Sequence, residues 1–594
     1  MEVGLRTKVS DYVMARLAAE VGHVFFLPGG GCMHLVDSLR RDQRLTPILC
    51  LHEQAVAVAA DAYSQCTGGL GVALVTAGPG STNAITGVAA SWIDSIPVLV
   101  VSGQAKSGEL IARWHVRQMG IQEVDIVSLV GPITKYAATV RDPRDIRLHL
   151  DEAIHACRSG RPGPVWVDIP LDVQGASVDV DSLAGRMTGE ARDDGARVAA
   201  LAREAADLLA NARRPAVLAG NGIRLAGAAD AFRRWAEAVG IPILTTWKAA
   251  DLLPEDHPLY VGRPGSIGQR GANFAQQNAD LLITLGARMD LAQVGFDFAG
   301  FAPRARKVVV EIDANEVAKL DFAVDVAAVT DAGIFLRELE AQARPWLDQE
   351  GWLDRCMAWK RRYPVAPQSP PDPAGPVDTY AFVEALGEQL GPDDVLVPGS
   401  SGSCAEIVLQ AFRVKAGQRV FNSPGLGSMG FGLPASIGAA VASGKRVVTV
   451  VGDGGLQHNI QELQTVRRLG LPIKIFVLAN DGYGSIRASQ ERYFDALLGA
   501  DPGSGLTLPD IVAVAQAYGL PAIRVKRGAD VGAGVRWALD MAGPAVCELM
   551  VDRDLATQPR LATSVAADGS VTSRPLEDLW PFLDRDELAV NMLA

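Results

Sequence analysis

Two polar segments, each following a hydrophobic run, could together bind a metal ion and a diphosphate. The run at 446–451 leads into Gly452-Asp453-Gly454-Gly455, and the run at 473–478 leads into Ala479-Asn480. Since the carboxyl ends of parallel strands meet at one sheet edge, Asp453 and Asn480 are expected to lie together. Carboxylate and amide oxygens suit Mg²⁺, and glycine lets backbone N–H groups approach a phosphate. The Gly-Asp-Gly turn alone would also fit an ordinary strand-to-helix connection. The second polar segment, which follows the next hydrophobic run, favours a metal and diphosphate site instead.

The elements that position these residues form three similar blocks. Short Val/Ile/Leu runs alternate with Ala/Leu-rich amphipathic stretches, which is typical of parallel sheets covered by helices. The sequence therefore predicts an α/β protein with three doubly wound parallel-sheet domains. A polar stretch and a Pro-rich stretch mark the boundaries. The expected division is a first domain over 1–173, a linker over 174–198, a central domain over 199–340, a linker over 341–376, a third domain over 377–555 and a C-terminal segment over 556–594.

Composition narrows the class of protein. The 594 residues are 48% hydrophobic and 21% charged, as in a folded chain rather than a disordered one. A net charge of -12 argues against a protein that coats nucleic acid. The seven cysteines are scattered, and the apolar runs are too short to cross a bilayer. We expect a cytoplasmic protein that binds neither nucleic acid nor membrane.

Several motifs in one order resemble a known family. The Gly-Asp-Gly to Asn segment resembles the diphosphate-binding motif of thiamine diphosphate enzymes, and GLQHNIQELQTVRRLGLPIK at 455–474 resembles their acetolactate (acetohydroxyacid) synthase branch. Matches over nearly the whole chain include FFLPGG at 25–30, LHEQAVAVAADAY at 51–63, TAGPGSTNAITGVAASWIDSIPVLVVSGQ at 76–104, RPGPVWVDIPLDVQ at 161–174 and GLGSMGFGLPASIGAA at 425–440. The resemblance implies pyrimidine-binding, central flavin-type and diphosphate-binding domains.

The same resemblance implies an activity and its cofactors. A 2-oxo acid such as pyruvate would be decarboxylated, and its two-carbon unit would be transferred to a carbonyl acceptor. The implied cofactors are thiamine diphosphate, Mg²⁺ and FAD, the last in a non-redox role. The resemblance also implies a homodimer or homotetramer, with room for a regulatory subunit. It leaves the acceptor and the pathway (branched-chain amino acid or other) open.

The metal site is carried over residue by residue. The resemblance implies that Asp453, Asn480 and the Gly482 carbonyl hold Mg²⁺, and that Gly452, Gly454 and Gly455 approach the diphosphate. The family usually has Asn-Asn where this chain has Ala479-Asn480. Because the second asparagine is kept, metal binding is expected to survive the change.

Glu53 has two interpretations. A glutamate in the first turn of a helix is commonly a favourable partner of the helix dipole. The resemblance implies instead that Glu53 hydrogen-bonds N1′ of the cofactor's pyrimidine and shares a proton with it. The apolar AVAVAA that follows would suit a carboxylate with that role.

Other cofactor positions come from the resemblance alone. Met429 would wedge the cofactor into its bent form, although a methionine is more often a core residue. This chain reads Gly-Ser-Ser at 399–401 where synthases usually have Gly-Gln-His, which leaves side-chain contacts there open. The implied contacts are Gly29, Gly78, Asn83, Gly399, Ser400, Gly427 and Met429.

Candidate substrate residues lie in both outer domains. Gln104 matches a catalytic glutamine facing the reacting centre, and Gln122 and Lys135 match residues of the substrate channel. Ile121 stands where synthases have Phe, and Ser485 and Ser489 fall in a segment where they have Gly-Met-Val-Arg-Gln-Trp. Loss of the large tryptophan ring predicts a roomier pocket and an acceptor larger than pyruvate, for example a keto-sugar nucleotide.

The central block resembles the synthases' FAD-binding region. Gly268, Asn273 and Arg288 fall on its pattern at 262–290, and Asp313 lies in VEIDANE at 310–316. A Rossmann-like domain that binds no cofactor is the alternative.

The C-terminal segment resembles the part of the synthases that folds over the active site. Its Trp580, Phe582 and Leu583 are costly to leave in water, which favours docking over a frayed end. We expect a lid. Two rival functions stay open: a simple 2-oxo acid decarboxylase that releases aldehyde, and a non-catalytic paralogue.

Overall fold

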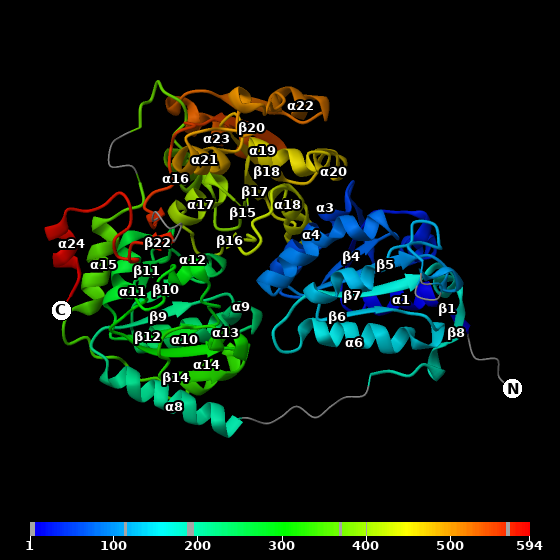
Figure 1. Ribbon diagram of the computed structural model, residues 1–594, viewed down its shortest axis with the longest axis horizontal. Helices are drawn as coiled ribbons and strands as arrows, with labels where there is room; N and C mark the ends of the chain where they lie inside the picture. The colour runs from blue at the N-terminus through cyan, green and yellow to red at the C-terminus, as the bar shows by residue number, and fades with distance from the viewer. Residues whose placement is uncertain are drawn as a thin grey trace.

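Three parallel α/β domains make up the protein (Figure 1). The computed structural model describes residues 6–111, 114, 116–186, 195–366, 371–399, 401–565 and 571–593. Each domain contains a six-stranded sheet in which every strand pairing is parallel, flanked by helices. The predicted fold class is confirmed. In the part of the chain described here, no helix combines the length and apolar character needed to cross a bilayer.

The first domain has the strand order β3-β2-β4-β5-β7-β6. Its central strands are buried on both faces, which explains their nearly continuous Val, Leu and Ile runs. The strands are β2 (His23–Phe26), β3 (Thr46–Leu49), β4 (Gly71–Val75), β5 (Val98–Gln104), β6 (Tyr136–Thr139) and β7 (Val165–Pro170).

The third domain repeats that arrangement. Its order is β16-β15-β17-β18-β20-β19. When the strands of each domain are counted along the chain, both sheets have the spatial order second, first, third, fourth, sixth, fifth. The strands are β15 (Val395–Pro398), β16 (Arg419–Val420), β17 (Val447–Gly452), β18 (Ile473–Ala479), β19 (Ala522–Val525) and β20 (Ala545–Met550).

The central domain has a different order, β11-β10-β9-β12-β13-β14. This is the dinucleotide-binding order, in which the chain reverses its direction of winding between the first and fourth strands. Here that point lies between β9 and β12. The strands are β9 (Pro215–Ala219), β10 (Ile243–Thr245), β11 (Tyr260–Gly262), β12 (Leu281–Leu285), β13 (Arg306–Glu311) and β14 (Val326–Val329).

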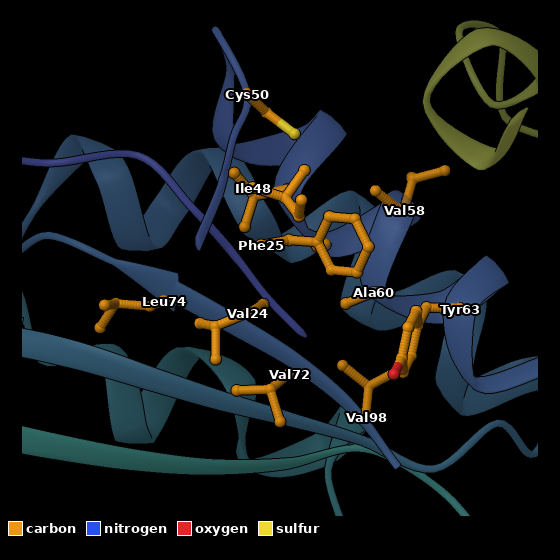
Figure 2. Close-up of a cluster of buried hydrophobic side chains, with 14 of the residues drawn as sticks. Val24, Phe25, Ile48, Cys50, Val58, Ala60, Tyr63, Val72, Leu74 and Val98 are labelled. Carbon is orange, nitrogen blue, oxygen red and sulfur yellow. The ribbon is translucent and has the colours of Figure 1, made fainter. Parts of the chain in front are cut away.

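Helix α3 (Glu53–Thr67) joins the first domain to the third. Below it lies the first domain's core, where Phe25 and Tyr63 meet edge to face (Figure 2). On its other side it packs against α18 (Gly432–Ser443) of the third domain. A Cβ at Gly438 would lie 2.0 Å from the Ala59 carbonyl oxygen, so only glycine allows these helices to approach so closely.

The C-terminal segment divides into two parts. Near its start, Tyr493 and Arg492 contact Thr563. The remainder docks on the central domain beside α11 (Arg270–Asn278) and α15 (Trp352–Arg362), and ends in α24 (Arg585–Asn591), drawn in red in Figure 1. Trp580 and Phe582 stay 37% and 44% exposed, while Leu583 packs against that core. The lid role stays a prediction.

Helix α15 lies inside the stretch expected to be a linker, 341–376. Its Trp352 and Trp359 are nevertheless buried in the core of the central domain, and Trp359 Nε1 donates to Asn591 Oδ1 at 2.8 Å. The prolines after this helix suggested a linker, but the apolar face before them is a docking surface.

Candidate active site

The carboxyl edge of the first sheet gathers the predicted first-domain residues. Glu53 begins α3 and is 7% exposed. The helix is capped by His52, whose Nδ1 accepts a hydrogen bond from Gln54 N at 3.1 Å. The Glu53 carboxylate instead accepts from Asn83 Nδ2, in α4 (Pro79–Asp94), at 3.0 Å. Helix capping therefore does not account for Glu53, and its carboxylate is directed by another predicted site residue.

Glycines allow the loops at this edge to pack closely. A Cβ at Gly29 would lie 2.5 Å from the Thr76 side chain, and one at Gly80 would lie 3.1 Å from Glu53 Oε1. Gly78 has φ +60°, and a Cβ there would lie 2.2 Å from the Gln122 carbonyl oxygen. The exposed Gln122 is thereby placed beside the same edge as Glu53.

Gln104, at the end of β5, is held from several sides. Its Nε2 donates to the Val124 carbonyl at 3.0 Å and to Asp168 Oδ2 at 3.1 Å, and its Oε1 accepts from Ala105 N at 2.9 Å. The side chain is only 3% exposed. Both amide hydrogens are thus used inside the domain, which fixes the direction of the side chain.

The sequence analysis missed Asp168, the carboxylate that helps to hold Gln104. It also accepts from Ser102 Oγ at 2.6 Å and from Thr139 Oγ1 at 3.1 Å. Burial raises the pKa of the Asp168 carboxyl to about 7, and these hydrogen bonds oppose that rise. A lone Asp inside the apolar strand VWVDIP is the sequence signal that could have found it.

Lys135 is not brought to this edge. It directly precedes β6, so it lies at the amino edge of the sheet, whereas the Glu53 edge is formed by the carboxyl ends of the strands. Its Nζ donates to the Ser159 carbonyl, and burial lowers the pKa of its ammonium group. The structure separates Lys135 from Gln122 because a parallel strand places its two ends at opposite edges.

The carboxyl edge of the third sheet gathers the predicted metal ligands. Asp453 follows β17 and accepts from Gly454 N at 2.8 Å and from Asn480 N at 3.0 Å. Burial raises the pKa of the Asp453 carboxyl to about 6, while backbone N–H groups oppose the rise. Gly482 has φ +145°, and a Cβ there would lie 2.1 Å from the Ala500 carbonyl oxygen. The predicted juxtaposition of the two strand ends is present.

Asn480 carries the clearest sign of a missing partner. Its Oδ1 is buried and accepts no hydrogen bond from the described residues. An orphaned buried oxygen costs free energy unless something binds it. The Asn480 carbonyl accepts from the buried Arg487, which the sequence analysis missed and which also donates to the Arg553 carbonyl at 2.7 Å. A hard cation beside Asp453 would satisfy the free oxygen.

The glycines of the same loop differ in their surroundings. A Cβ at Gly454 would lie 2.5 Å from the Tyr483 ring, so this position needs glycine for packing. At Gly452 and Gly455, apart from the adjoining residues and the backbone of the same helix, no atom of the described chain lies within 4 Å of where a Cβ would be. The open side of the loop is thus formed by these two residues.

The remaining predicted cofactor contacts lie on neighbouring loops. Met429 is 38% exposed, so it does not fill a gap in the core, and Gly427 has φ +65°. Gly399 follows β15, and a Cβ there would lie 2.5 Å from Cys404 Sγ. Ser400 lies outside the described residues.

Ser485 and Ser489 lie on the exposed surface of α21 (Gly484–Phe494). Ser489 Oγ donates to the Ser485 carbonyl at 2.9 Å, one helical turn earlier. A Cβ at Gly402 would lie 2.9 Å from Ser485 Oγ. The start of α21 therefore lies beside the loop that begins at Gly399.

A separate cavity of about 400 Å³ opens at the switch point of the central domain. The loops after β9 and β12 touch there: a Cβ at Gly220 would lie 2.0 Å from the Gly286 carbonyl oxygen. The cavity reaches Gly399 in the third domain and Arg161 in the first. A cavity at this point of such a sheet suits a dinucleotide.

Of the predicted flavin residues, Arg288 lines this cavity. Asn273 is fully buried and holds Gly265 and the Leu576 carbonyl, so it supports the lining from behind. Gly268 packs against the same Gly265.

Asp313 caps α13 (Ala314–Ala318) and pairs with Arg161. Other acidic residues do line the cavity, among them Glu311, which lies in the same VEIDANE segment but was not chosen as a candidate. Its position at the end of β13, two residues before Asp313, was the available signal.

Comparison with known proteins identifies the class. Three family models match the chain, all described as thiamine pyrophosphate enzyme domains: the N-terminal TPP binding domain over residues 7–129, the central domain over 202–339 and the C-terminal TPP binding domain over 400–549. Each match falls on one of the three sheets. The chain therefore belongs to the thiamine pyrophosphate (thiamine diphosphate) enzymes, and thiamine diphosphate is its cofactor.

Curated relatives narrow the family. The acetolactate synthase large subunit of Corynebacterium glutamicum is 34% identical and matches 96% of this chain and 90% of its own length. The acetolactate synthase isozyme 2 large subunit of Escherichia coli is 34% identical over 91% and 95%, and the probable acetolactate synthase large subunit of Methanocaldococcus jannaschii is 33% identical over 92% and 92%. The chain belongs to the acetolactate synthase large-subunit family and is a thiamine diphosphate-dependent enzyme of that type.

Proposed function

We propose that the protein decarboxylates pyruvate or a related 2-oxo acid and transfers the two-carbon unit to a carbonyl acceptor. The observation that carries this proposal is the buried, unpartnered Oδ1 of Asn480 beside Asp453. Bound thiamine diphosphate supplies a nucleophilic carbon and an electron sink for the decarboxylation. The chain must then bind that cofactor, orient the substrates and exclude water.

Each half-site has its own task. Asp453, Asn480 and the Gly482 carbonyl would hold Mg²⁺, with the open side of Gly452 and Gly455 toward the diphosphate. At the other half-site, Glu53 would hold a proton against N1′ of the pyrimidine, and Asn83 would keep its carboxylate in place.

We propose that the two half-sites meet between two copies of the chain. Apolar side chains are exposed around both, which is unusual for a surface that faces only water. In the first domain they are Met33, Leu51, Met119 and Ile121, in segments that also carry predicted site residues, and in the third they are Met429, Ile486, Phe494 and Leu498. A homodimer would cover both sets. The relatives are named large subunits, which is consistent with a further regulatory partner.

FAD is proposed for the cavity of the central domain. Arg288 and Glu311 would contact it there, and the close glycine loops at the switch point leave room for an extended dinucleotide. Since the proposed carboligation involves no net redox change, the flavin would act as a structural ligand. Flavin absorbance that co-purifies with the protein and is lost on Arg288→Ala tests this assignment.

The acceptor is proposed to be larger than pyruvate. At positions 485 and 489, the exposed surface of α21 carries small serine side chains. A small side chain leaves space that a tryptophan ring would occupy, and pockets discriminate between substrates through such contacts. The described free cysteines (six buried, Cys66 half-buried) agree with a reducing compartment, and we propose the cytoplasm.

An acceptor screen with pyruvate, thiamine diphosphate and Mg²⁺, analysed by mass spectrometry, tests the proposal. A coupled product with a large keto acceptor is expected. Acetolactate formed from two pyruvates at the rate of the synthases would contradict the acceptor assignment. Free acetaldehyde without any coupled product would favour a simple decarboxylase, and no CO₂ release from any 2-oxo acid would refute the activity.

A further inference from the structure

A buried glutamate of the third domain holds the loop that leads to Glu53 in the first. Glu462 begins α20 (Glu462–Leu469) and is fully buried. Its Oε1 accepts from the backbone N–H of Leu51 at 2.8 Å, and the N–H of His52 also hydrogen-bonds its carboxylate. Thr465 Oγ1 donates to Oε2 at 2.6 Å. One carboxylate therefore collects donors from two domains.

Helix α20 holds the same loop a second time. Arg468, on the next turn after Thr465, donates to the Leu49 carbonyl at 2.5 Å. The connection from β3 to α3 is thus fixed at a carbonyl on one side and at two N–H groups on the other. Its backbone leaves little freedom in where α3 starts, and Glu53 is the first residue of that helix.

The energetics indicate that Glu462 is not there for stability alone. Burial raises the pKa of its carboxyl, so the charged form is expensive in this position even with its hydrogen bonds. An apolar residue or a direct backbone pairing could close a simple domain contact at lower cost. A buried acceptor that orients two amides is better suited to fixing geometry.

The segment that carries Glu462 also reaches the loop of Met429. Asn459, three residues earlier, donates from Nδ2 to the Gly430 carbonyl at 2.9 Å. A Cβ at Gly430 would lie 2.7 Å from that Asn459 nitrogen. Residues 459–468 therefore link the loop that leads to Glu53 with the loop that carries Met429, and both loops hold predicted cofactor contacts.

We propose that Glu462 is a positioning residue for the reaction. It orients the N–H groups of Leu51 and His52, and so sets the direction in which the Glu53 carboxylate projects. The inference rests on the proposed function, because it assumes that Glu53 acts on the cofactor. Misplacing a reacting group by about 1 Å can cost about a hundredfold in rate, so a small movement of this loop is sufficient for a large effect.

The test replaces Glu462 with the nearly isosteric glutamine. Glu462→Gln keeps one oxygen acceptor but removes the negative charge, so the hydrogen bonds from the Leu51 and His52 amides become weaker, and its new amide nitrogen can only donate, to the Thr465 hydroxyl. Exchange of the C2 proton of bound thiamine diphosphate, followed by quenched-flow NMR, is expected to slow about tenfold or more. The affinity for thiamine diphosphate with Mg²⁺ should change less than about twofold, since Asp453 and Asn480 are intact.

Two further variants keep the test decisive. Thr465→Val removes a donor and leaves both backbone contacts of Glu462, so its exchange rate should match the unmodified protein. Arg468→Ala removes the contact to Leu49 from an exposed helix face, and exchange should slow about two- to fivefold even if Glu462→Gln does not fold.

Specific outcomes would overturn the inference. The inference fails if Glu462→Gln exchanges the C2 proton as fast as the unmodified protein. If Glu462→Gln does not fold, the inference fails when Arg468→Ala exchanges that proton as fast as the unmodified protein. Weaker cofactor binding with normal exchange would show that Glu462 serves the diphosphate side instead. If the unmodified protein itself exchanged no C2 proton, the proposed function would fail first and the inference with it.

Discussion

The first and third domains share one strand order and differ in what they place at its carboxyl edge. Both sheets gather their functional side chains at the carboxyl ends of strands, after β3, β4 and β5 in the first domain and after β17 and β18 in the third. In the first domain this edge carries a carboxylate, Glu53, held by a neighbouring amide. In the third it carries Asp453 and Asn480, the proposed oxygen ligands of Mg²⁺. The common scaffold supplies a position, and the residues after the strands decide the chemistry.

The two edges are also incomplete in different ways. In the third domain, Asn480 Oδ1 is buried without a partner among the described residues and the loop is open at Gly455, which fits the proposed Mg²⁺ and diphosphate. In the first, Leu51 and Ile121 are exposed on either side of the Glu53 edge in sequence, which fits the proposed contact with a second copy of the chain. Each edge offers what the other lacks, which favours one site built from two chains.

Mixing two inactive variants tests this complementarity, with the largest expected effect. Glu53→Gln and Asp453→Ala should each lower activity at least about a hundredfold, because one loses the proton carrier and the other the metal. A hybrid dimer would contain one site with both residues intact. Random mixing should therefore restore about a quarter of the activity of the unmodified protein.

The same experiment has its own control. Two samples of Glu53→Gln mixed together should stay inactive, which excludes recovery through handling alone. If the mixture of the two different variants also stayed inactive while forming mixed dimers, each site would have to lie within one chain. That result would remove the subunit-shared site.

A second prediction concerns the contact that fixes the two domains to each other. Gly438→Ala would place a methyl group 2.0 Å from the Ala59 carbonyl oxygen, so α3 and α18 must separate. We expect a loss of about 1–3 kcal/mol, measured as a lower midpoint of thermal unfolding. If the midpoint were unchanged, the close approach of these helices would not be needed.

Gly387→Ala is the matched control. Gly387 lies in α16 (Thr379–Gln389), and the nearest atom to a Cβ there, in the Phe412 ring, is at an ordinary 3.7 Å. Removing a helical glycine without a clash should stabilise the protein by up to about 1 kcal/mol. The two alanine variants should therefore shift the midpoint in opposite directions.

Site residues could be predicted from the sequence where their position depends on neighbouring residues in the chain, and not where it depends on residues far away in the sequence. Asp453 and Asn480 directly follow apolar runs, and adjacent parallel strands place both at one edge, so local spacing was sufficient. Glu462, Asp168 and Glu311 were missed because their partners or cavity walls are brought together only by the fold. Glu462, for example, is bonded to a residue 411 positions away.

Lys135 and α15 show the opposite error. A motif match grouped Lys135 with Gln122, yet a strand direction that the match did not consider places Lys135 at the amino edge. Proline content suggested a linker at 341–376, while the buried faces of Trp352 and Trp359 depend on a surface elsewhere in the chain. In both cases the local sequence features were identified correctly, but the sequence did not show which part of the folded protein these residues would contact.

The smallest predicted effect comes from a comparison of two buried carboxylates, Asp168 in the first domain and Asp453 in the third. Burial raises the pKa of Asp453 to about 6 and that of Asp168 to about 7, but only Asp453 stands beside an unpartnered ligand oxygen. Asp168 is satisfied within its own domain by Ser102, Gln104 and Thr139. The protonation state of Asp168 should therefore affect the stability of the folded protein, whether or not a ligand is bound.

The sign of that effect follows from proton linkage. Because the pKa of Asp168 in the folded protein is about 7 against an ordinary 3.8, the folded state binds the proton more tightly between those values. Its stabilising contribution is complete below about pH 4 and is lost as the pH rises through about 7. The unfolding midpoint of the unmodified protein, relative to Asp168→Asn, should fall by a few degrees between pH 5 and pH 8.

Asp172→Asn is the control, because the pKa of Asp172 is shifted in the opposite direction. Burial by itself would raise the pKa of Asp172, but hydrogen bonds from Ser107 lower it below its ordinary value. Relative to Asp172→Asn, we therefore expect no such fall of the midpoint. Equal pH dependence in the Asp168 and Asp172 variants would mean that Asp168 is not held in the protonated form by its surroundings.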